Sequence, residues 1–163
     1  AQDISVCNRT SEPGLIVLRS FGKFYGLAGA RLGFAFGPHK PIEELRSLLG
    51  PWAVSGPAMA IGTKALRDTT WASAMRDALA AQMNTLEATL LEAGFRVIGR
   101  TDLFITVRHA EASAIAEHLA RDHILVRPFA EDATLLRFGL SADAESFARL
   151  KAALGSFLKS GKR

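Results

Sequence analysis

The chain has 163 residues, of which 48% are hydrophobic, 22% charged and 8% aromatic, a composition typical of globular proteins rather than of disordered or fibrous ones. Charged residues interrupt every apolar stretch before it could span a membrane, and no charged and then apolar leader opens the chain, so a soluble cytoplasmic protein is expected. The single cysteine, Cys7, excludes an internal disulfide and a cysteine-based zinc site. No metal site is expected either, because metal-ligand spacing is absent among the four histidines, His39, His109, His118 and His123.

The charge balance points to small anions as ligands. There are 20 basic and 16 acidic residues, a net charge of +4, and 14 of the basic residues are arginine. The planar fork of arginine favours phosphate and carboxylate groups. Basic residues nowhere form a run of five, and few aromatic residues flank the arginines, so nucleic-acid binding is not expected.

The first part of the chain predicts two strands separated by an irregular loop. Residues 1–14 are polar and rich in turn formers, and the apolar run at residues 15–18 predicts a buried strand in a sheet covered on both faces. A second strand is predicted over residues 31–36. The segment between them, residues 19–30, holds three glycines and one lysine and predicts a ligand-binding loop. Because two buried strands cannot complete a parallel sheet, we expect further strands to precede this chain.

The rest of the chain predicts helices and then a mixed pattern. The longest predicted helix covers residues 71–93 and is followed by Gly94 at the position of a left-handed cap. The terminal helix is amphipathic, with Ser141 or Asp143 as its N-cap. The other predicted elements are helices over 41–49, 57–67 and 112–122 and strands over 95–98, 103–108, 124–127 and 135–139.

This change of pattern predicts a domain boundary between residues 68 and 69. We expect an α/β protein in which residues 1–68 are a slice of a larger sheet domain. Residues 69–163 then form a small α+β domain that begins with the long helix.

Lys23 is the candidate reactive residue of the loop. A lysine beside close-approaching backbone is partly desolvated, and desolvation makes its amine a nucleophile toward an aldehyde. Ser20, three residues before it, and Arg31, eight residues after it, could hold a phosphate beside that aldehyde. On residue chemistry alone, an exposed loop lysine is the simpler alternative.

Residues 20–33, Ser-Phe-Gly-Lys-Phe-Tyr-Gly-Leu-Ala-Gly-Ala-Arg-Leu-Gly, resemble the lysine segment of fold-type I pyridoxal-phosphate aminotransferases. The serine, the lysine, the Gly-Leu pair, the following glycine, the arginine and the last glycine all match in register. The resemblance implies that Lys23 forms a Schiff base with pyridoxal 5'-phosphate and that Ser20 and Arg31 bind the cofactor phosphate. It also implies that this chain is the C-terminal part of a fold-type I transferase, and that the intact protein is a homodimer.

Three further segments, 19–26, 50–57 and 136–140, more narrowly resemble the threonine-phosphate decarboxylases of cobalamin biosynthesis. The resemblance runs from Pro13 to the terminal helix and implies decarboxylation of L-threonine O-3-phosphate to (R)-1-amino-2-propanol phosphate. A histidinol-phosphate-type aminotransferase is the alternative. An inactive fragment is a second alternative, because the family residues that clamp the cofactor ring lie upstream; Asp3 is more simply a solvated loop aspartate than the partner of the ring.

Two arginines are candidates for the anions of the substrate. Arg137 lies among apolar residues of a predicted strand, so its guanidinium reaches an edge or meets an anion. The resemblance implies that Arg137 binds the substrate carboxylate and that Arg127 binds the substrate phosphate. The alternatives are a structural salt bridge from Arg137 to Glu131 or Asp132, and an exposed strand-end charge at Arg127.

Other positions carry weaker expectations. The resemblance places Trp52 and Ser55 near the cofactor, although a tryptophan in a proline-flanked loop is more simply a packing anchor. The four histidines are expected on the surface. Arg137 would serve transamination and decarboxylation equally well, so only the close sequence match of the motifs to the decarboxylases favours decarboxylation.

Overall fold

The computed structural model describes residues 5–160 of the chain, and Asp3 lies outside them. The chain forms two compact units, Ala1–Thr69 and Thr70–Arg163. This division falls beside the predicted domain boundary, and the assignment of the first unit to a larger cofactor-binding domain stays a prediction. Among the described helices, none combines the length and the apolar character that crossing a membrane requires.

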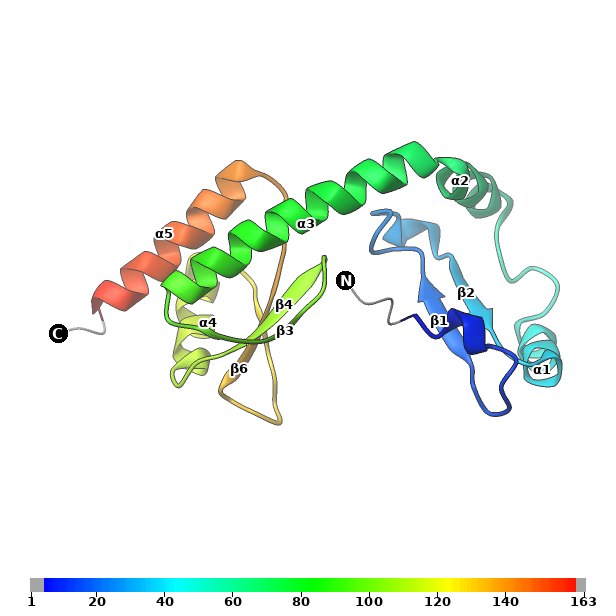
Figure 1. The fold of residues 1–163 in the computed structure, drawn as a ribbon, viewed down its shortest axis with the longest axis horizontal. Helices are drawn as coiled ribbons and strands as arrows, with labels where there is room; N and C mark the ends of the chain where they lie inside the picture. The colour runs from blue at the N-terminus through cyan, green and yellow to red at the C-terminus, as the bar shows by residue number, and fades with distance from the viewer. Residues whose placement is uncertain (1–4, 161–163) are drawn as a thin grey trace. The chain divides into compact units, whose positions relative to one another are not determined.

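The described residues of the first unit, from Ser5 onward, form a two-stranded sheet, two helices and two short 3-10 turns (Figure 1). In chain order its elements are η1 (Cys7–Arg9), β1 (Val17–Ser20), η2 (Ala28–Ala30), β2 (Gly33–Phe36), α1 (His39–Leu49) and α2 (Gly56–Arg67). The strands β1 and β2 are antiparallel neighbours. Both helices and both strands were expected from the sequence, within two residues at most boundaries.

The sheet of the first unit differs from the prediction in direction and in burial. The strand predicted at residues 15–18 was expected to be buried in a parallel sheet, but β1 pairs antiparallel and Leu18 is 75% exposed. A parallel pair needs a crossover connection, usually a helix, whereas residues 21–32 form a compact loop with one three-residue 3-10 turn. Leu18 is exposed because the described part of this unit has almost no core to cover it: its buried apolar side chains are those of Phe21 and Ala58.

Capping residues set the ends of α1 and α2. Gly50, with φ of 73°, ends α1. The Ser55 Oγ atom accepts a hydrogen bond from the Ala58 amide at 3.3 Å, and Pro57 occupies the first turn of α2. Ser55 is therefore the N-cap of α2. Trp52, in the connector, is 90% exposed, so the prediction of a packing anchor is wrong for the described chain.

The second unit is a two-layer α+β domain. Its elements are α3 (Thr69–Glu92), which begins at the division, β3 (Arg96–Arg100), β4 (Phe104–Arg108), α4 (Ala112–Arg121), β5 (Arg127–Pro128), β6 (Leu135–Gly139) and α5 (Ala144–Ser160). The strands form an antiparallel sheet in the order β3-β4-β6-β5. Every other element predicted for this unit is present, but of the strand expected over residues 124–127 only Arg127 lies in a strand, the two-residue β5.

The three helices of the second unit pack on one face of its sheet (Figure 1). Alternate residues of β4 and β6 face this layer, because successive side chains of a strand point to opposite faces. Full burial of each large apolar side chain contributes about 1.5–3 kcal/mol. The most deeply buried residues of this core are Met83, Leu86, Leu90, Ile105, Val107, Ile115, Leu119, Leu136 and Phe138.

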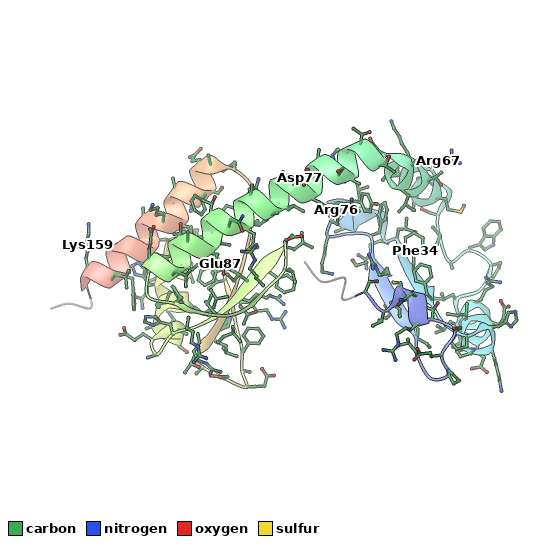
Figure 2. All side chains as sticks on the ribbon, viewed as in Figure 1. Phe34, Arg67, Arg76, Asp77, Glu87 and Lys159 are labelled. Atoms are coloured by element: carbon green, nitrogen blue, oxygen red, sulfur yellow. The ribbon has the colours of Figure 1, made fainter. Side chains whose placement is uncertain are left out.

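An ion pair joins the outer strand of this sheet to the long helix. Arg100, the last residue of β3, donates to the carboxylate of Glu87. Glu87 lies on α3 (Figure 2). The same guanidinium donates to Asn84 Oδ1 at 2.9 Å. Because both side chains of the ion pair are about two-thirds covered, this contact fixes β3 against α3 more firmly than an exposed pair would.

Asp143, one of the two predicted caps, begins α5. Its Oδ1 atom accepts the Ser146 amide at 2.8 Å. Hydrogen bonds from Ser146 hold the pKa of Asp143 below its ordinary value. A carboxylate whose pKa is lowered by folding stabilises the fold above its unfolded-state pKa, and this contribution is lost as the pH falls through the folded-state pKa.

We therefore expect Asp143→Ala to lower the midpoint of thermal unfolding at neutral pH, with a smaller difference from the unmodified chain in strong acid. Asp143→Asn keeps a capping oxygen without a titrating charge, so its stability should depend less on acid pH. Calorimetry at the two pH values checks this. A deficit of the alanine variant that is the same at both would contradict the role of the ionised cap.

Candidate functional site

The loop between β1 and β2 is closed at its base by strand pairing. Ser20, the last residue of β1, is the register partner of Gly33, and the Phe21 amide donates to the Leu32 carbonyl at 3.3 Å. Arg31 lies two residues before Gly33. The strand pair therefore brings Ser20 and Arg31 to the two ends of the same loop.

Lys23 lies in a tight turn of this loop. The Gly26 amide donates to the Lys23 carbonyl at 3.1 Å, and Gly26 has φ of 66°, a conformation that favours glycine. The buried ring of Phe21 stacks on Tyr25 with ring centroids 4.5 Å apart, which anchors the turn. The Lys23 Nζ atom donates to Ser20 Oγ at 3.5 Å, so the amine and the hydroxyl are within reach of one small ligand.

The exposure of Lys23 corrects one expectation. Its side chain is exposed in the described chain, whereas the sequence predicted partial desolvation. The reason is that the neighbouring β1 is itself exposed and the described residues of the first unit bury little apolar surface. These residues by themselves do not exclude water from the amine.

Arg31 is held by backbone contacts at the other end of the loop. It follows η2 in the left-handed region, with φ of 52°, and its amide and Nη1 atom donate to the Ala28 carbonyl at 3.3 Å and 3.1 Å. Neither Arg31 nor Lys23 takes part in an ion pair within residues 5–160. The loop thus presents an amine, a hydroxyl and a guanidinium without a carboxylate, a donor set that suits a small anion.

Gly22 allows two parts of the loop to approach closely. A Cβ atom at Gly22 would lie 2.9 Å from the Ala28 Cα atom, whereas one at Gly29 would have nothing within 4 Å. We expect Gly22→Ala to destabilise the loop by about 1–3 kcal/mol, the usual cost of overpacking. The matched Gly29→Ala should have little effect. Hydrogen exchange at the Phe21 amide, which donates to the Leu32 carbonyl, checks this, and equal exchange in the two variants would show that the close approach does not hold the loop.

The second unit brings two of the predicted arginines together. In the pairing of β5 with β6, Arg127 lies directly opposite Arg137. Directly opposed residues of an antiparallel pair share a face of the sheet, and the neighbours of Arg137 in β6 fill the core, so both arginines lie on the face away from the helices. The Arg137 guanidinium lies 4.8 Å from the centre of the Phe104 ring, and that of Arg127 lies 6.0 Å from the Phe129 ring. In the described structure neither guanidinium forms an ion pair.

The carboxylate expected to pair with Arg137 is held elsewhere. Asp132 Oδ2 accepts from Arg108 Nη2 at 3.0 Å, and Asp132 Oδ1 accepts from the Thr134 amide at 2.9 Å and the Thr134 hydroxyl at 2.5 Å. The hydrogen bonds from Thr134 and the charge of Arg108 hold the pKa of Asp132 below its ordinary value. The alternative of a salt bridge from Arg137 to Glu131 or Asp132 is therefore wrong, which leaves Arg137 free for an external anion.

Sequence reasoning missed the role of Asp132 and the partner of Arg108. The signal was present, since an aspartate followed two residues later by a threonine is typical of side-chain-closed turns. The stacking of Arg137 on Phe104 depends on the alignment of β4 with β6, which the sequence does not display.

The histidines divide into two groups. His39 and His123 are exposed, as predicted. His118 Nε2 lies 2.9 Å from Ser156 Oγ, and the His109 ring packs against a core phenylalanine, so both are half-buried and the surface prediction is wrong for them. All four lie outside the loop of Ser20, Lys23 and Arg31, called the lysine loop below. They also lie outside the sheet face that carries Arg127 and Arg137, called the arginine face.

Comparison with known proteins decides the family. The family model described as Aminotransferase class I and II matches residues 2–154. The chain belongs to this family. It is 45% identical over 148 residues to the threonine-phosphate decarboxylase of Pseudomonas aeruginosa, covering 91% of this chain and 44% of the relative. It is 43% identical over 152 residues to that of a Sinorhizobium species, covering 93% and 45%.

Aminotransferases of the family are also similar. The histidinol-phosphate aminotransferase of a Jannaschia species is 34% identical over 120 residues, covering 72% of this chain and 33% of the relative. The solved histidinol-phosphate aminotransferase of Sinorhizobium meliloti in complex with pyridoxal-5'-phosphate has a TM-score of 0.78 at 24% identity, covering 94% of this chain and 44% of that chain. The predicted fold, that of fold-type I pyridoxal-phosphate transferases, is confirmed. The chain spans less than half the length of these relatives.

Proposed function

We propose that a protein of the relatives' length containing this chain uses pyridoxal phosphate to decarboxylate L-threonine O-3-phosphate. The product is (R)-1-amino-2-propanol phosphate, an intermediate of cobalamin biosynthesis. The observation that carries the proposal is the opposition of Arg127 and Arg137 on one sheet face without a carboxylate partner in the described chain. Two such cations suit a substrate that carries both a phosphate and a carboxylate, because the arginine fork favours each of these groups.

The similarity to named relatives supports the choice of reaction. The two threonine-phosphate decarboxylases share 45% and 43% identity with the chain, against 34% for the Jannaschia aminotransferase. By the same family resemblance we include a homodimer in the proposal.

The lysine loop fits pyridoxal phosphate by its donor set. Lys23 supplies an amine for an aldehyde carbon, and Ser20 supplies a hydroxyl 3.5 Å from that amine for a phosphate oxygen. Arg31 supplies the guanidinium for the same phosphate from the other end of the loop. When bound, the cofactor supplies a ring that accepts the electron pair of the broken Cα bond.

The arginine face would orient the substrate. Arg137 binds the substrate carboxylate through two parallel hydrogen bonds, and Phe104 beneath its guanidinium fixes the plane of the fork. Arg127 binds the phosphate and so holds the other end of the substrate. By holding the carboxylate in a fixed orientation, Arg137 would decide whether that group leaves as carbon dioxide or stays. Lys23, released from the aldehyde by the substrate amine and protonated, would then deliver a proton to Cα.

The alternative is a histidinol-phosphate-type aminotransferase, which the similarity to such enzymes favours. Histidinol phosphate also carries a phosphate for Arg127. It has no carboxylate, so it would leave Arg137 to an amino-acid or keto-acid co-substrate.

The test supplies threonine phosphate, threonine, and histidinol phosphate with 2-oxoglutarate to an enzyme of the relatives' length that carries these residues. We expect carbon dioxide from threonine phosphate, much less from threonine, and no keto product from histidinol phosphate. Keto product from histidinol phosphate, with no carbon dioxide from either amino acid, would replace the decarboxylase with the aminotransferase.

A further inference from the structure

We propose that Asp132 is a positioning residue, which sets the β5–β6 register that places Arg127 and Arg137 on one face of the sheet. The use of that face for substrate rests on the proposed function. The register itself is a property of the fold and does not depend on it.

Asp132 lies at the centre of the hairpin that joins β5 to β6. The two register pairs, Arg127 with Arg137 and Pro128 with Leu136, are symmetric about position 132. A backbone hydrogen bond closes a turn over residues 132–135, in the half of the hairpin that leads into β6: the Leu135 amide donates to the Asp132 carbonyl at 3.0 Å. The Asp132 side chain reinforces this half of the hairpin, because its Oδ1 atom accepts two hydrogen bonds from Thr134.

The turn is also fastened to the central strand of the sheet. Arg108, the last residue of β4, is the register partner of Leu135 and donates to the second oxygen of Asp132 at 3.0 Å. The His109 amide donates to the Thr134 carbonyl at 2.9 Å. One carboxylate therefore joins the tip of the hairpin to the end of β4.

The pairing of β5 with β6 needs this support because it is short and carries like charges. β5 has two residues, one of which is Pro128, which has no amide hydrogen to donate to the ladder. Two arginines directly opposite each other repel. A slip of one residue would move Arg127 to the other face of the sheet, where the helices pack.

The same contacts keep the Asp132 charge away from the arginine pair. Both carboxylate oxygens are occupied by Arg108 and Thr134, and Arg137 has no ion pair in the described chain. Asp132 thus fixes the two cations without neutralising them.

The experiment uses the 163-residue chain with two measurements. Cross-strand nuclear Overhauser contacts between backbone protons of Arg127 and Arg137 report the register, and titration with O-phospho-L-threonine, followed at the arginine Nε–H signals, reports anion binding. The variants are Asp132→Ala, Asp132→Asn and the matched control Glu131→Ala, whose carboxylate forms no ion pair in the described structure.

We expect Asp132→Ala to lose the cross-strand contacts and to weaken binding about tenfold or more, as expected when one charge-assisted contact is lost. Asp132→Asn keeps an oxygen for Thr134 and should restore the contacts in part. Glu131→Ala should change neither measurement. If the alanine variant does not fold, judged by the core methyl signals, Thr134→Val is measured by the same criteria.

Persistence of the contacts in Asp132→Ala, or their equal loss in Glu131→Ala, would overturn the positioning role. Unchanged binding after the contacts are lost would also overturn it. If the unmodified chain shows the contacts but does not bind phosphothreonine, the substrate assignment fails, and the contacts alone still decide the role of Asp132.

Discussion

Replacing Lys23 by alanine is expected to abolish turnover of threonine phosphate in an enzyme of the relatives' length that carries this chain. The Lys23 amine both attaches the cofactor and delivers a proton to Cα in the proposed reaction. Loss of a proton-transfer group alone lowers kcat by about 10²–10⁴-fold, so we expect a fall at the upper end of that range or beyond. Steady-state assays give kcat, and borohydride reduction followed by peptide mass analysis locates the cofactor.

The matched control is Lys40→Ala, because Lys40 is also exposed and also in the first unit. We expect full activity and a pyridoxyl group on Lys23 in this variant. A pyridoxyl group on Lys40, or substantial activity of Lys23→Ala, would remove Lys23 from the site. The 163-residue chain by itself should hold the cofactor weakly, since its own residues leave the amine open to water.

The arginine face gives the second large effect. Truncating one partner of a hydrogen-bonded charge pair in a binding site costs about 2–5 kcal/mol, so Arg137→Ala should lower kcat/KM by about 30- to 5,000-fold. Arg137→Lys should recover little of this, because lysine lacks the planar fork. Arg127→Ala should lower kcat/KM for threonine phosphate and leave that for threonine nearly unchanged.

The control for these variants is Arg121→Ala. Arg121 is exposed on α4 and pairs only loosely with Glu117, at 3.9 Å, so its removal should not change either substrate. An equal loss for threonine and threonine phosphate in Arg127→Ala would show that Arg127 does not bind the phosphate.

The local patterns of the second unit were enough to predict most of its elements. The helical period and Gly94 predicted α3, and the strand at Leu135–Gly139 appears at its predicted bounds. The helix carries apolar residues three or four positions apart and ends just before Gly94, and the strand is a short, mostly apolar run that ends at a glycine. The terminal helix was also predicted from its apolar spacing, and of the two predicted N-caps, Ser141 and Asp143, it is Asp143 that caps α5.

Tertiary relations were harder to predict. The direction of β1 depends on how the loop after it folds back, and a four-residue apolar run does not encode this. The membership of Lys23, Ser20 and Arg31 in one loop was predictable, whereas the exposure of Lys23 was not.

The arginine face shows the same limit. Arg127 and Arg137 were each candidates, but their opposition depends on a register set by the turn at Asp132. That turn was visible as an Asp-x-Thr pattern, and its partner Arg108 lies on another strand, 24 residues away.

The fate of the substrate carboxylate tests the proposed function most directly. Threonine phosphate labelled with carbon-13 in its carboxyl group is supplied, together with 2-oxoglutarate as an amino acceptor, to an enzyme of the relatives' length that carries this chain, and the products are followed by carbon and phosphorus NMR. We predict that the label leaves as carbon dioxide and bicarbonate while unlabelled 1-amino-2-propanol phosphate accumulates. Label retained in a phosphorylated keto acid would contradict decarboxylation.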